Sequence, residues 1–233
     1  MNGMKTVSIH QPNFIPWLGY FYKIAKSDVF VILDDVQYTK NSFINRNKIK
    51  TPQGPKWLTI PVKQSGKFGQ MINETAISNR EKSLKKVLRT IEQNYKKATW
   101  FDRYFEELSG ILMHSPDVIS KLNSELILWM MKALGIQTDI RYSSSLETNN
   151  LQGTERLAAI CEYLQADQYF SGFGGVKYQE EEIFRQANIQ VTVSDFSHPE
   201  YEQLWGDFQQ GLSIIDLLLN CGPQSLDVLL GRN

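Results

Sequence analysis

Short apolar runs and helical repeats alternate from the beginning of this sequence. Residues 6–9 predict a short buried strand, and residues 29–33 form a continuous apolar run rich in β-branched side chains, which is typical of a strand buried on both faces of a parallel sheet. Between them, apolar residues recur at intervals of three and four, and this spacing predicts an amphipathic helix over residues 16–26. We therefore expect the chain to begin with a βαβ unit whose crossover is right-handed.

The middle of the sequence is mostly helical. Residues 35–51 are polar and predict an ordered loop with a helical turn, and the Pro-Gln-Gly-Pro stretch at 52–55 is typical of a turn. We expect a strand over residues 57–62 and another short one over 68–72. Three segments then show helical spacing of apolar residues: 81–96, 100–113 and 116–134. The third of these helices is expected to carry Asp117 in its first turn.

Strands and helices alternate again in the last part of the chain. We expect, in order, strand 138–142, helix 154–164, strand 168–170, helix 178–187, strand 189–193 and a last helical turn or two at 225–230. A further helix is predicted to start at Ser213, with Asp216 as an approximate capping box. The alternation predicts an α/β fold, a Rossmann-like parallel sheet flanked by helices, with a helical insertion at about 80–134. Since no repeat or linker interrupts it, we expect a single domain over residues 1–233.

Charge and composition narrow the class of protein. The chain has 233 residues, of which 42% are apolar, and its 25 basic residues balance its 25 acidic ones. Such a balance argues against nucleic acid as the main ligand. No segment reaches the roughly 18 apolar residues of a membrane span, and the first residues lack the apolar core of a signal peptide. With only 2 cysteines, we expect a cytoplasmic protein in a reducing compartment.

Polar side chains follow the first two predicted strands. His10 and Gln11 come at the end of the first strand, and Asp34 and Asp35 come at the end of the second. Ligands of open α/β sheets bind outside the carboxyl ends of the strands, so these residues are candidates for catalysis and binding. The histidine suits a general base, and a carboxylate could accept a proton, bind a sugar hydroxyl or hold Mg²⁺. A hydrogen bond from His10 to its own loop, and an aspartate that caps a turn, are the structural alternatives.

Two further stretches could bind an anion. Residues 37–48 mix cations with amides, and Arg46 could grip a phosphate bidentately, although a solvated surface loop would look similar. Residues 171–175 form a glycine-rich turn between a strand and a helix, which lets the backbone approach a phosphate or thioester closely. Glycines at such a turn also serve packing alone. The turn lacks the Gly-Lys-Ser/Thr of a Walker motif and the full dinucleotide fingerprint.

The remaining histidine and cysteine side chains argue against a zinc site and against a thiol mechanism. His198 follows a predicted strand and is expected to face His10 across a shared crevice, yet neither lies in a cluster with the spacing of zinc ligands. Cys221 lies at the end of a helix, where the dipole raises the pKa of a thiol. No Gly-x-Ser-x-Gly elbow is present, which disfavours a hydrolase triad.

Taken together, several motifs resemble the WbqC-like family. They are Ile9-His-Gln-Pro-Asn13 with Pro16-Trp-Leu-Gly-Tyr20, Leu33-Asp-Asp-Val-Gln-Tyr38 with Asn45-Arg-Asn-Lys-Ile49, and His198-Pro-Glu-Tyr201 with Leu212-Ser-Ile-Ile-Asp-Leu-Leu218. The resemblance covers nearly the whole chain. It implies a bacterial protein of surface-polysaccharide synthesis, often encoded with O-antigen genes, and a transfer of glycine or another acyl group to an amino sugar. The first βαβ unit also resembles Rossmann-like nucleotidyltransferases, but their His-x-Gly-His motif is absent.

The leading hypothesis is therefore an acyl- or aminoacyltransferase that acts on an amino sugar, nucleotide-linked, and takes its acyl group from a thioester or an aminoacyl carrier. The candidate catalytic residues are His10, Asp34, Asp35 and His198. The candidate substrate-binding residues are Gln11, Asn13, Gln37, Asn45, Arg46, Lys48, Ser171, Gly172, Gly174, Gly175 and Tyr201. Two alternatives stay open: a nucleotidyltransferase-like enzyme that uses Mg²⁺, and a non-catalytic sugar-binding module of a polysaccharide pathway.

Overall fold

The structure is a computed structural model that describes residues 3–64, 69–148, 150–174 and 180–232. Its internal contacts divide the chain into two compact units. The sheet unit consists of Met1–Gln11, Tyr22–Asp35 and Gln137–Ser197, and the helical unit consists of Pro12–Phe21, Val36–Ile136 and His198–Asn233. That the two units act as one domain stays a prediction.

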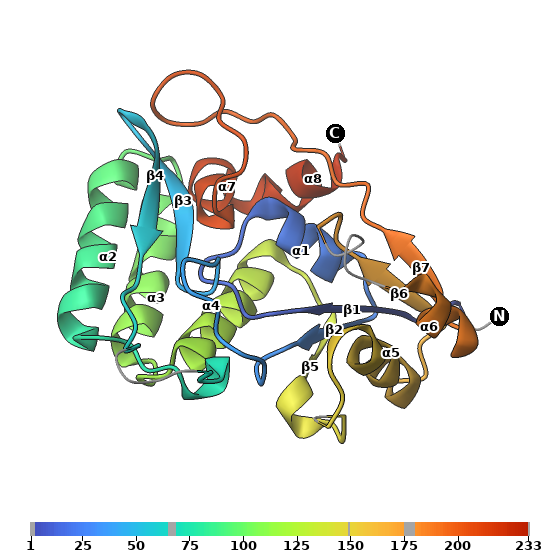
Figure 1. The fold of residues 1–233 in the computed structure, drawn as a ribbon. Helices are drawn as coiled ribbons and strands as arrows, with labels where there is room; N and C mark the ends of the chain where they lie inside the picture. The colour runs from blue at the N-terminus through green and yellow to red at the C-terminus, as the bar shows by residue number, and fades with distance from the viewer. Residues whose placement is uncertain (1–2, 65–68, 149, 175–179, 233) are drawn as a thin grey trace. The chain divides into compact units, whose positions relative to one another are not determined.

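The sheet unit is built on five parallel strands in the order β5-β2-β1-β6-β7 (Figure 1). Their bounds are Thr6–His10 for β1, Val29–Ile32 for β2, Asp139–Tyr142 for β5, Gln168–Ser171 for β6 and Gln190–Val193 for β7. Strand β1 is central, because Val7 pairs with Val29 of β2 on one side and with Tyr169 of β6 on the other. The predicted Rossmann-like α/β sheet is confirmed.

Helices cover both faces of this sheet. Helices α5 (Gly153–Tyr163) and α6 (Glu181–Gln186) pack on the face that carries Val7 and Ile9 of β1. The opposite face, which carries Ser8 and His10, is covered by the end of α1 (Leu18–Ala25), whose residues from Tyr22 onward belong to this unit. A short 3₁₀ turn, η2 (Ser143–Ser145), follows β5.

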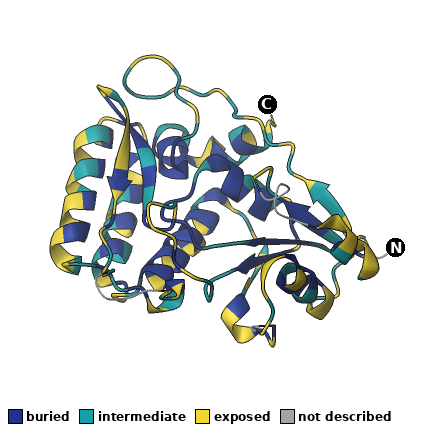
Figure 2. Cartoon of the chain, viewed as in Figure 1, coloured by how far each residue is buried: buried dark blue, intermediate teal, exposed yellow. Residues whose placement is uncertain are grey.

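The helical unit contains five α-helices among its described residues: α2 (Arg80–Tyr95), α3 (Phe101–His114), α4 (Ile119–Leu134), α7 (Ile214–Cys221) and α8 (Ser225–Leu230). Two 3₁₀ turns, η1 (Ile72–Glu74) and η4 (Gly222–Gln224), and the antiparallel hairpin β3 (Arg46–Thr51) and β4 (Gly54–Thr59) complete it. Helix α4 is buried along most of its length (Figure 2). Helices α2, α3 and α4 confirm the predicted helical insertion.

Strand β3 corrects the expectation of a polar loop up to residue 51. Its buried positions include Asn47 and Lys50, which are 0% and 1% exposed. The Asn47 side-chain amide donates to the Ile15 carbonyl at 2.7 Å, and the Lys50 ammonium donates to the Asp207 carbonyl at 2.6 Å. Because these polar groups find partners inside the helical unit, a segment with little apolar character forms a buried strand.

Three local predictions differ from the structure in detail. Asp117 precedes α4 instead of starting it, and its carboxylate pairs with Arg80 at 3.2 Å. The short strand expected at 68–72 reduces, within the described residues, to one bridge between Met71 and Gln37. Ser213 does cap α7, but Asp216 accepts hydrogen bonds from tyrosines instead of completing a capping box.

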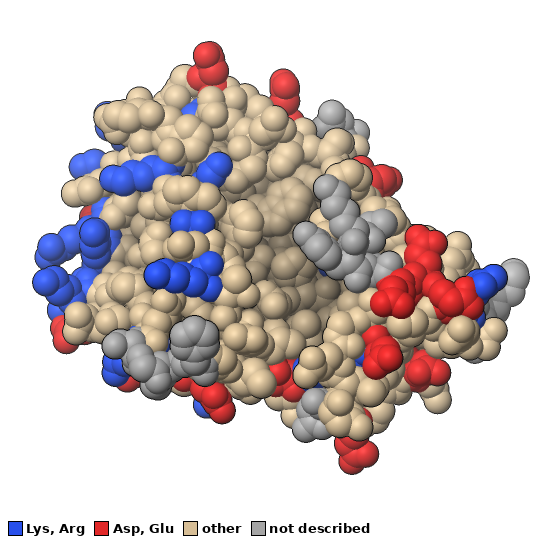
Figure 3. Space-filling model, in the orientation of Figure 1, with Lys and Arg blue, Asp and Glu red and all other residues tan. Residues whose placement is uncertain are grey.

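Charges are distributed unevenly over the surface. Lysines and arginines gather over α2 and the β3–β4 hairpin of the helical unit, and carboxylates gather over α5 and α6 of the sheet unit (Figure 3). The exposed basic residues of α2 are Lys82, Lys85, Lys86 and Arg89. The net charge of the whole chain is zero, but the surface has a basic region on the helical unit and an acidic region on the sheet unit.

Gly222 ends α7 in a backbone conformation that an L-residue rarely adopts, with φ 55° and ψ −128°. A Cβ atom there would lie 2.2 Å from Cδ2 of Trp100. We expect Gly222→Ala to lower the free energy of unfolding by about 2 kcal/mol or more, since the strain and the clash add. Gly110→Ala in α3 is the control: its Cβ would meet open space, so it should raise stability by about 0.5–1 kcal/mol. Urea midpoints measure both changes, and equal effects would contradict this account.

Candidate functional site

The carboxyl ends of β1 and β6 lie at the point where the strand order of the sheet reverses. The chain adds β2 and β5 on one side of β1 and then crosses to the other side to form β6 and β7. The helices that follow β1 and precede β6 therefore lie on opposite faces, which separates the loops at the two strand ends. In doubly wound sheets, ligands bind at this position. His10 and Gln11 lie at the end of β1, and Ser171 and Gly172 lie at the end of β6.

His10 is half-buried and uncharged at neutral pH. Its Nδ1 lies 3.0 Å from the backbone carbonyl of Gln11. A carbonyl only accepts, so this contact favours the tautomer with the proton on Nδ1 and a lone pair on Nε2. Burial, and secondly the positive charge of Lys23, lower the pKa of His10 to about 3. The ring is therefore uncharged at neutral pH, so it can accept a proton there but has no imidazolium proton to give.

Lys23 is a residue that the sequence analysis did not single out. It lies on α1, is only 4% exposed, and its ammonium donates to the carbonyl of Ile9 at 3.3 Å. Burial lowers the pKa of Lys23 to about 8. The helix gives one signal for its position, because Lys23 is the single charged residue between Leu18 and Ala25, and a helix that is apolar nearly all round is a buried helix.

The carboxylates of Asp34 and Asp35 both bond to the segment that follows β5. Asp34 Oδ1 accepts from the backbone N–H of Ser144 at 3.1 Å, and its Oδ2 accepts from the Ser144 hydroxyl at 2.8 Å. Asp35 accepts from the hydroxyl of Ser143 and forms an ion pair with Arg156 at 2.6 Å. This pair is nearly buried, with side chains 14% and 8% exposed. Both carboxylates thus hold the end of β2 to η2 and α5.

The glycine-rich turn follows β6 directly. Ser171 is fully buried, Gly172 is half-buried, and Phe173 is 78% exposed. Gly174 is exposed, and the predicted binding residue Gly175 lies outside the described residues. A Cβ atom on Gly172 would lie 3.6 Å from Cδ and 3.9 Å from Nζ of Lys23. The turn and the buried lysine are therefore in close contact.

In the helical unit, Arg46 and Lys48 lie beside an aromatic ring. The Arg46 guanidinium carbon is 4.4 Å from the ring centroid of Trp57, and the Lys48 ammonium is 5.2 Å from it. Phe43 packs against the same ring, with centroids 5.8 Å apart. Arg46 also donates to the carbonyl of Asn41 at 2.6 Å. The predicted anion-binding cations are thus engaged in cation–π contacts on the surface of the hairpin.

The other predicted residues of this unit are largely committed to the fold. Asn45 is 7% exposed and donates to the Ile60 carbonyl at 2.8 Å, and Asn13 is 5% exposed. Gln37 is exposed and bridges Met71. Their roles in substrate binding stay predictions.

His198 and Tyr201 also have structural partners. The ring of His198 lies 5.4 Å from that of Trp17, and burial lowers the pKa of the imidazole. The Tyr201 hydroxyl donates to Asp216 at 2.9 Å, and the hydroxyl of Tyr95 donates to the same carboxylate at 2.7 Å. Burial raises the pKa of Asp216. That His198 faces His10 stays a prediction.

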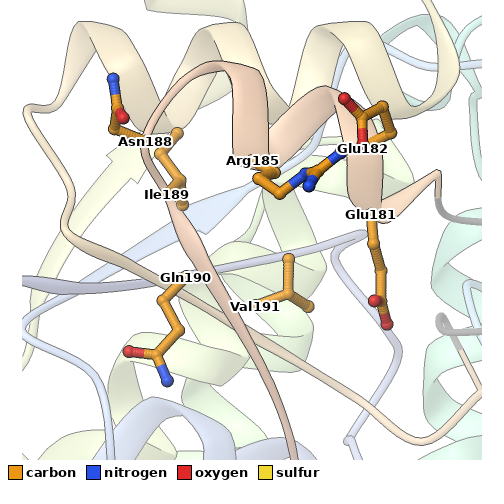
Figure 4. A pocket seen from close by; sticks show the side chains of 7 residues that line it. All are labelled: Glu181, Glu182, Arg185, Asn188, Ile189, Gln190 and Val191. Atoms are coloured by element: carbon orange, nitrogen blue, oxygen red, sulfur yellow. Dashed lines mark hydrogen bonds and ion pairs between the residues drawn. The ribbon is translucent and has the colours of Figure 1, made fainter.

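A hollow of about 660 Å³ lies elsewhere, along α6 and β7 (Figure 4). Its lining includes Glu181, Glu182 and Arg185, and the last two form an ion pair. None of the predicted site residues lines it. Two glutamates beside a single arginine make it a poor place for an anionic substrate.

Both cysteines are weak nucleophiles at neutral pH. Burial raises the pKa of Cys161 to about 12 and, together with the nearby carboxylates, raises that of Cys221 to about 11. Within the described ranges, no group of three or more His, Cys, Asp or Glu side chains gathers as metal ligands would. None of the helices in those ranges has the length and apolar character to cross a bilayer.

The shifted pKa of His10 predicts a pH dependence of stability. The unfolded chain binds a proton at this ring as the pH falls through 6.5, whereas the folded protein does so only near 3. Folding therefore loses stability between these values, with a slope of up to about 1.4 kcal/mol per pH unit from this one group. We expect the difference in unfolding free energy between the native protein and His10→Gln to shrink steadily from pH 7 to pH 4. Parallel stability curves would contradict the shift.

The Asp35–Arg156 pair predicts a large structural effect. Arg156→Leu leaves a nearly buried carboxylate without its cation, and we expect a loss of about 3–5 kcal/mol in the free energy of unfolding. Arg185→Ala, which removes an exposed pair with Glu182, is the control and should cost about 0.5 kcal/mol or less. Denaturant titration measures both. Similar losses for the two variants would show that burial does not strengthen the first pair.

Comparisons with known proteins show which family the chain belongs to. Residues 11–228 match the model of the WbqC-like protein family. The chain is 41% identical over 228 residues to the uncharacterized protein Rv1507c of Mycobacterium tuberculosis, a match that covers 97% of this chain and 98% of that protein. No solved structure matches significantly. The chain belongs to the WbqC-like protein family.

Proposed function

We propose that this protein is an acyl- or aminoacyltransferase that acts on an amino sugar, in nucleotide-linked form, during synthesis of a bacterial surface polysaccharide. The polysaccharide context follows from what the resemblance to the family implies. The observation that carries the proposal is the position of His10. An uncharged imidazole ends β1 beside the glycine-rich turn after β6, where doubly wound sheets bind their ligands.

The chemistry requires one proton acceptor and one site for negative charge. The sugar amine attacks the acyl carbon, and the bond from that carbon to the sulfur or oxygen of the donor then breaks. His10 Nε2 accepts the proton that the amine loses. Backbone N–H groups of the turn at Ser171 and Gly172 stabilise the oxyanion that forms on the acyl group. No thiol intermediate is needed, which agrees with the raised pKa values of both cysteines.

The network around Asp34 and Asp35 favours acyl transfer over a reaction that holds Mg²⁺ on these carboxylates. Ser143, Ser144 and Arg156 already donate to their oxygens. A divalent cation at these oxygens would compete with these donors. In this proposal the two aspartates fix the end of β2, and Asp34 is the secondary candidate for proton transfer.

Product mass tests the proposal directly. The protein is incubated with nucleotide-linked amino sugars and with thioester or aminoacyl donors, and the products are identified by mass spectrometry. We expect an acylated sugar, and we expect His10→Gln to lower the turnover about 100-fold or more. His114→Gln is the matched control, because His114 lies exposed at the end of α3 in the helical unit.

Two results would contradict the proposal. Release of pyrophosphate from a nucleoside triphosphate, dependent on Mg²⁺, would instead support nucleotidyl transfer. Binding of nucleotide sugars without turnover, unchanged in His10→Gln, would instead support a sugar-binding module.

A further inference from the structure

Helix α1 carries a buried cation that the proposed mechanism does not use. Lys23 is 4% exposed, and its ammonium group has three N–H donors. Within the part of the chain that the structure describes, it has one acceptor, the Ile9 carbonyl, at the long distance of 3.3 Å. Ile9 is the last residue but one of β1. The ammonium therefore lies at the carboxyl end of the central strand.

This cation has no carboxylate partner among the described residues, whose ion pairs involve other lysines and arginines. A buried charge without a counter-ion destabilises the folded protein. With a pKa of about 8, Lys23 still carries its charge at neutral pH. The buried positive charge of Lys23 is explained if a bound ligand supplies the negative charge that pairs with it.

The lysine lies against the glycine-rich turn. A Cβ atom on Gly172 would be 3.9 Å from the Lys23 ammonium, so this group lies close to the backbone that follows β6. An anion bound here would meet the ammonium and the backbone of the turn together. The position agrees with the place where α/β sheets bind phosphate groups, outside the carboxyl ends of their strands.

The next residue supplies a different surface. Phe173 is 78% exposed, which is the largest exposed fraction among the large apolar side chains of the described residues. A solvated aromatic ring directly after a phosphate-sized position provides a face on which a nucleobase can stack. A cation for phosphate and a ring for a base are the two parts of a nucleotide site.

We propose that Lys23 and Phe173 bind the nucleoside diphosphate part of the substrate, with the Lys23 ammonium on the diphosphate and the Phe173 ring on the base. The inference rests on the proposed function and identifies which part of a substrate the sheet unit holds. A nucleotide-linked sugar and an acyl coenzyme A thioester both contain this chemistry. The base preference separates the two sources, because UDP- and dTDP-linked sugars carry uracil or thymine and coenzyme A carries adenine.

The cations of the hairpin are weaker candidates for the same role. Arg46 and Lys48 already lie over Trp57, and neither is buried without a partner. Removal of a half-exposed cation changes binding less than removal of a buried one, because water screens it.

Isothermal titration calorimetry with pyrophosphate, UDP and ADP tests the inference. We expect Lys23→Met to weaken the binding of all three ligands about tenfold or more, and to raise the thermal midpoint because the unpaired charge is gone. Phe173→Ala should weaken the two nucleotides about fivefold or more and leave pyrophosphate unchanged. The matched controls are Lys26→Met, an exposed lysine directly after the same helix, and Tyr163→Ala, a ring that is 56% exposed at the end of α5.

Each outcome decides one part of the inference. Tighter binding of UDP than ADP assigns the site to the sugar substrate, and the reverse assigns it to the acyl donor. Pyrophosphate and nucleotide affinities unchanged in Lys23→Met would overturn the inference, as would a loss of turnover with unchanged affinity. Binding that depends on Lys23, in a protein that forms no acylated sugar, would refute the proposed function and leave this site standing.

Discussion

Parallel pairing of β1 between β2 and β6 is the constraint on which the candidate chemistry depends. Since neighbouring strands run in the same direction, the residues that follow them emerge at one edge of the sheet. His10, Asp34 and Ser171 are far apart in the sequence, and each follows or ends one of these three strands. The chain adds strands first on one side of β1 and then on the other, so the carboxyl end of β1 lies at the point where the strand order reverses. Antiparallel pairing at either side of β1 would send these groups to opposite edges.

Some charged groups at this edge of the sheet have a full set of hydrogen-bond or ion-pair partners, and others do not. Asp34 and Asp35 have donors from Ser143, Ser144 and Arg156, so burial of their charge is compensated and they stabilise the sheet. Lys23 has a single long hydrogen bond among the described residues, and its charge lowers the pKa of His10. The arrangement around the two aspartates is typical of residues that stabilise the fold. The arrangement around Lys23 costs stability in the unliganded protein and is typical of a site that a ligand completes.

Periodicity predicted the sheet because its strands are apolar and its helices amphipathic. The same reasoning missed β3, since Asn47 and Lys50 fill buried positions that apolar residues usually occupy, and their partners Ile15 and Asp207 cannot be recognised from local sequence. Strand ends correctly indicated where His10 and the glycine-rich turn lie. The sequence did not indicate Lys23 because a lysine on a helix normally faces water, and only the structure shows that this one is buried. The partners of Asp35 lie more than 100 residues away, so its role in the fold was equally hidden.

Hydrogen–deuterium exchange with and without a saturating nucleotide-linked sugar tests the central claim most directly, because it locates the ligand without relying on substitutions. The account predicts slower exchange in peptides that cover residues 6–12 and 169–174, with little change in those that cover residues 181–191. Protection confined to the β3–β4 hairpin, or to α6 and β7, would contradict it and would place the ligand away from the carboxyl ends of β1 and β6.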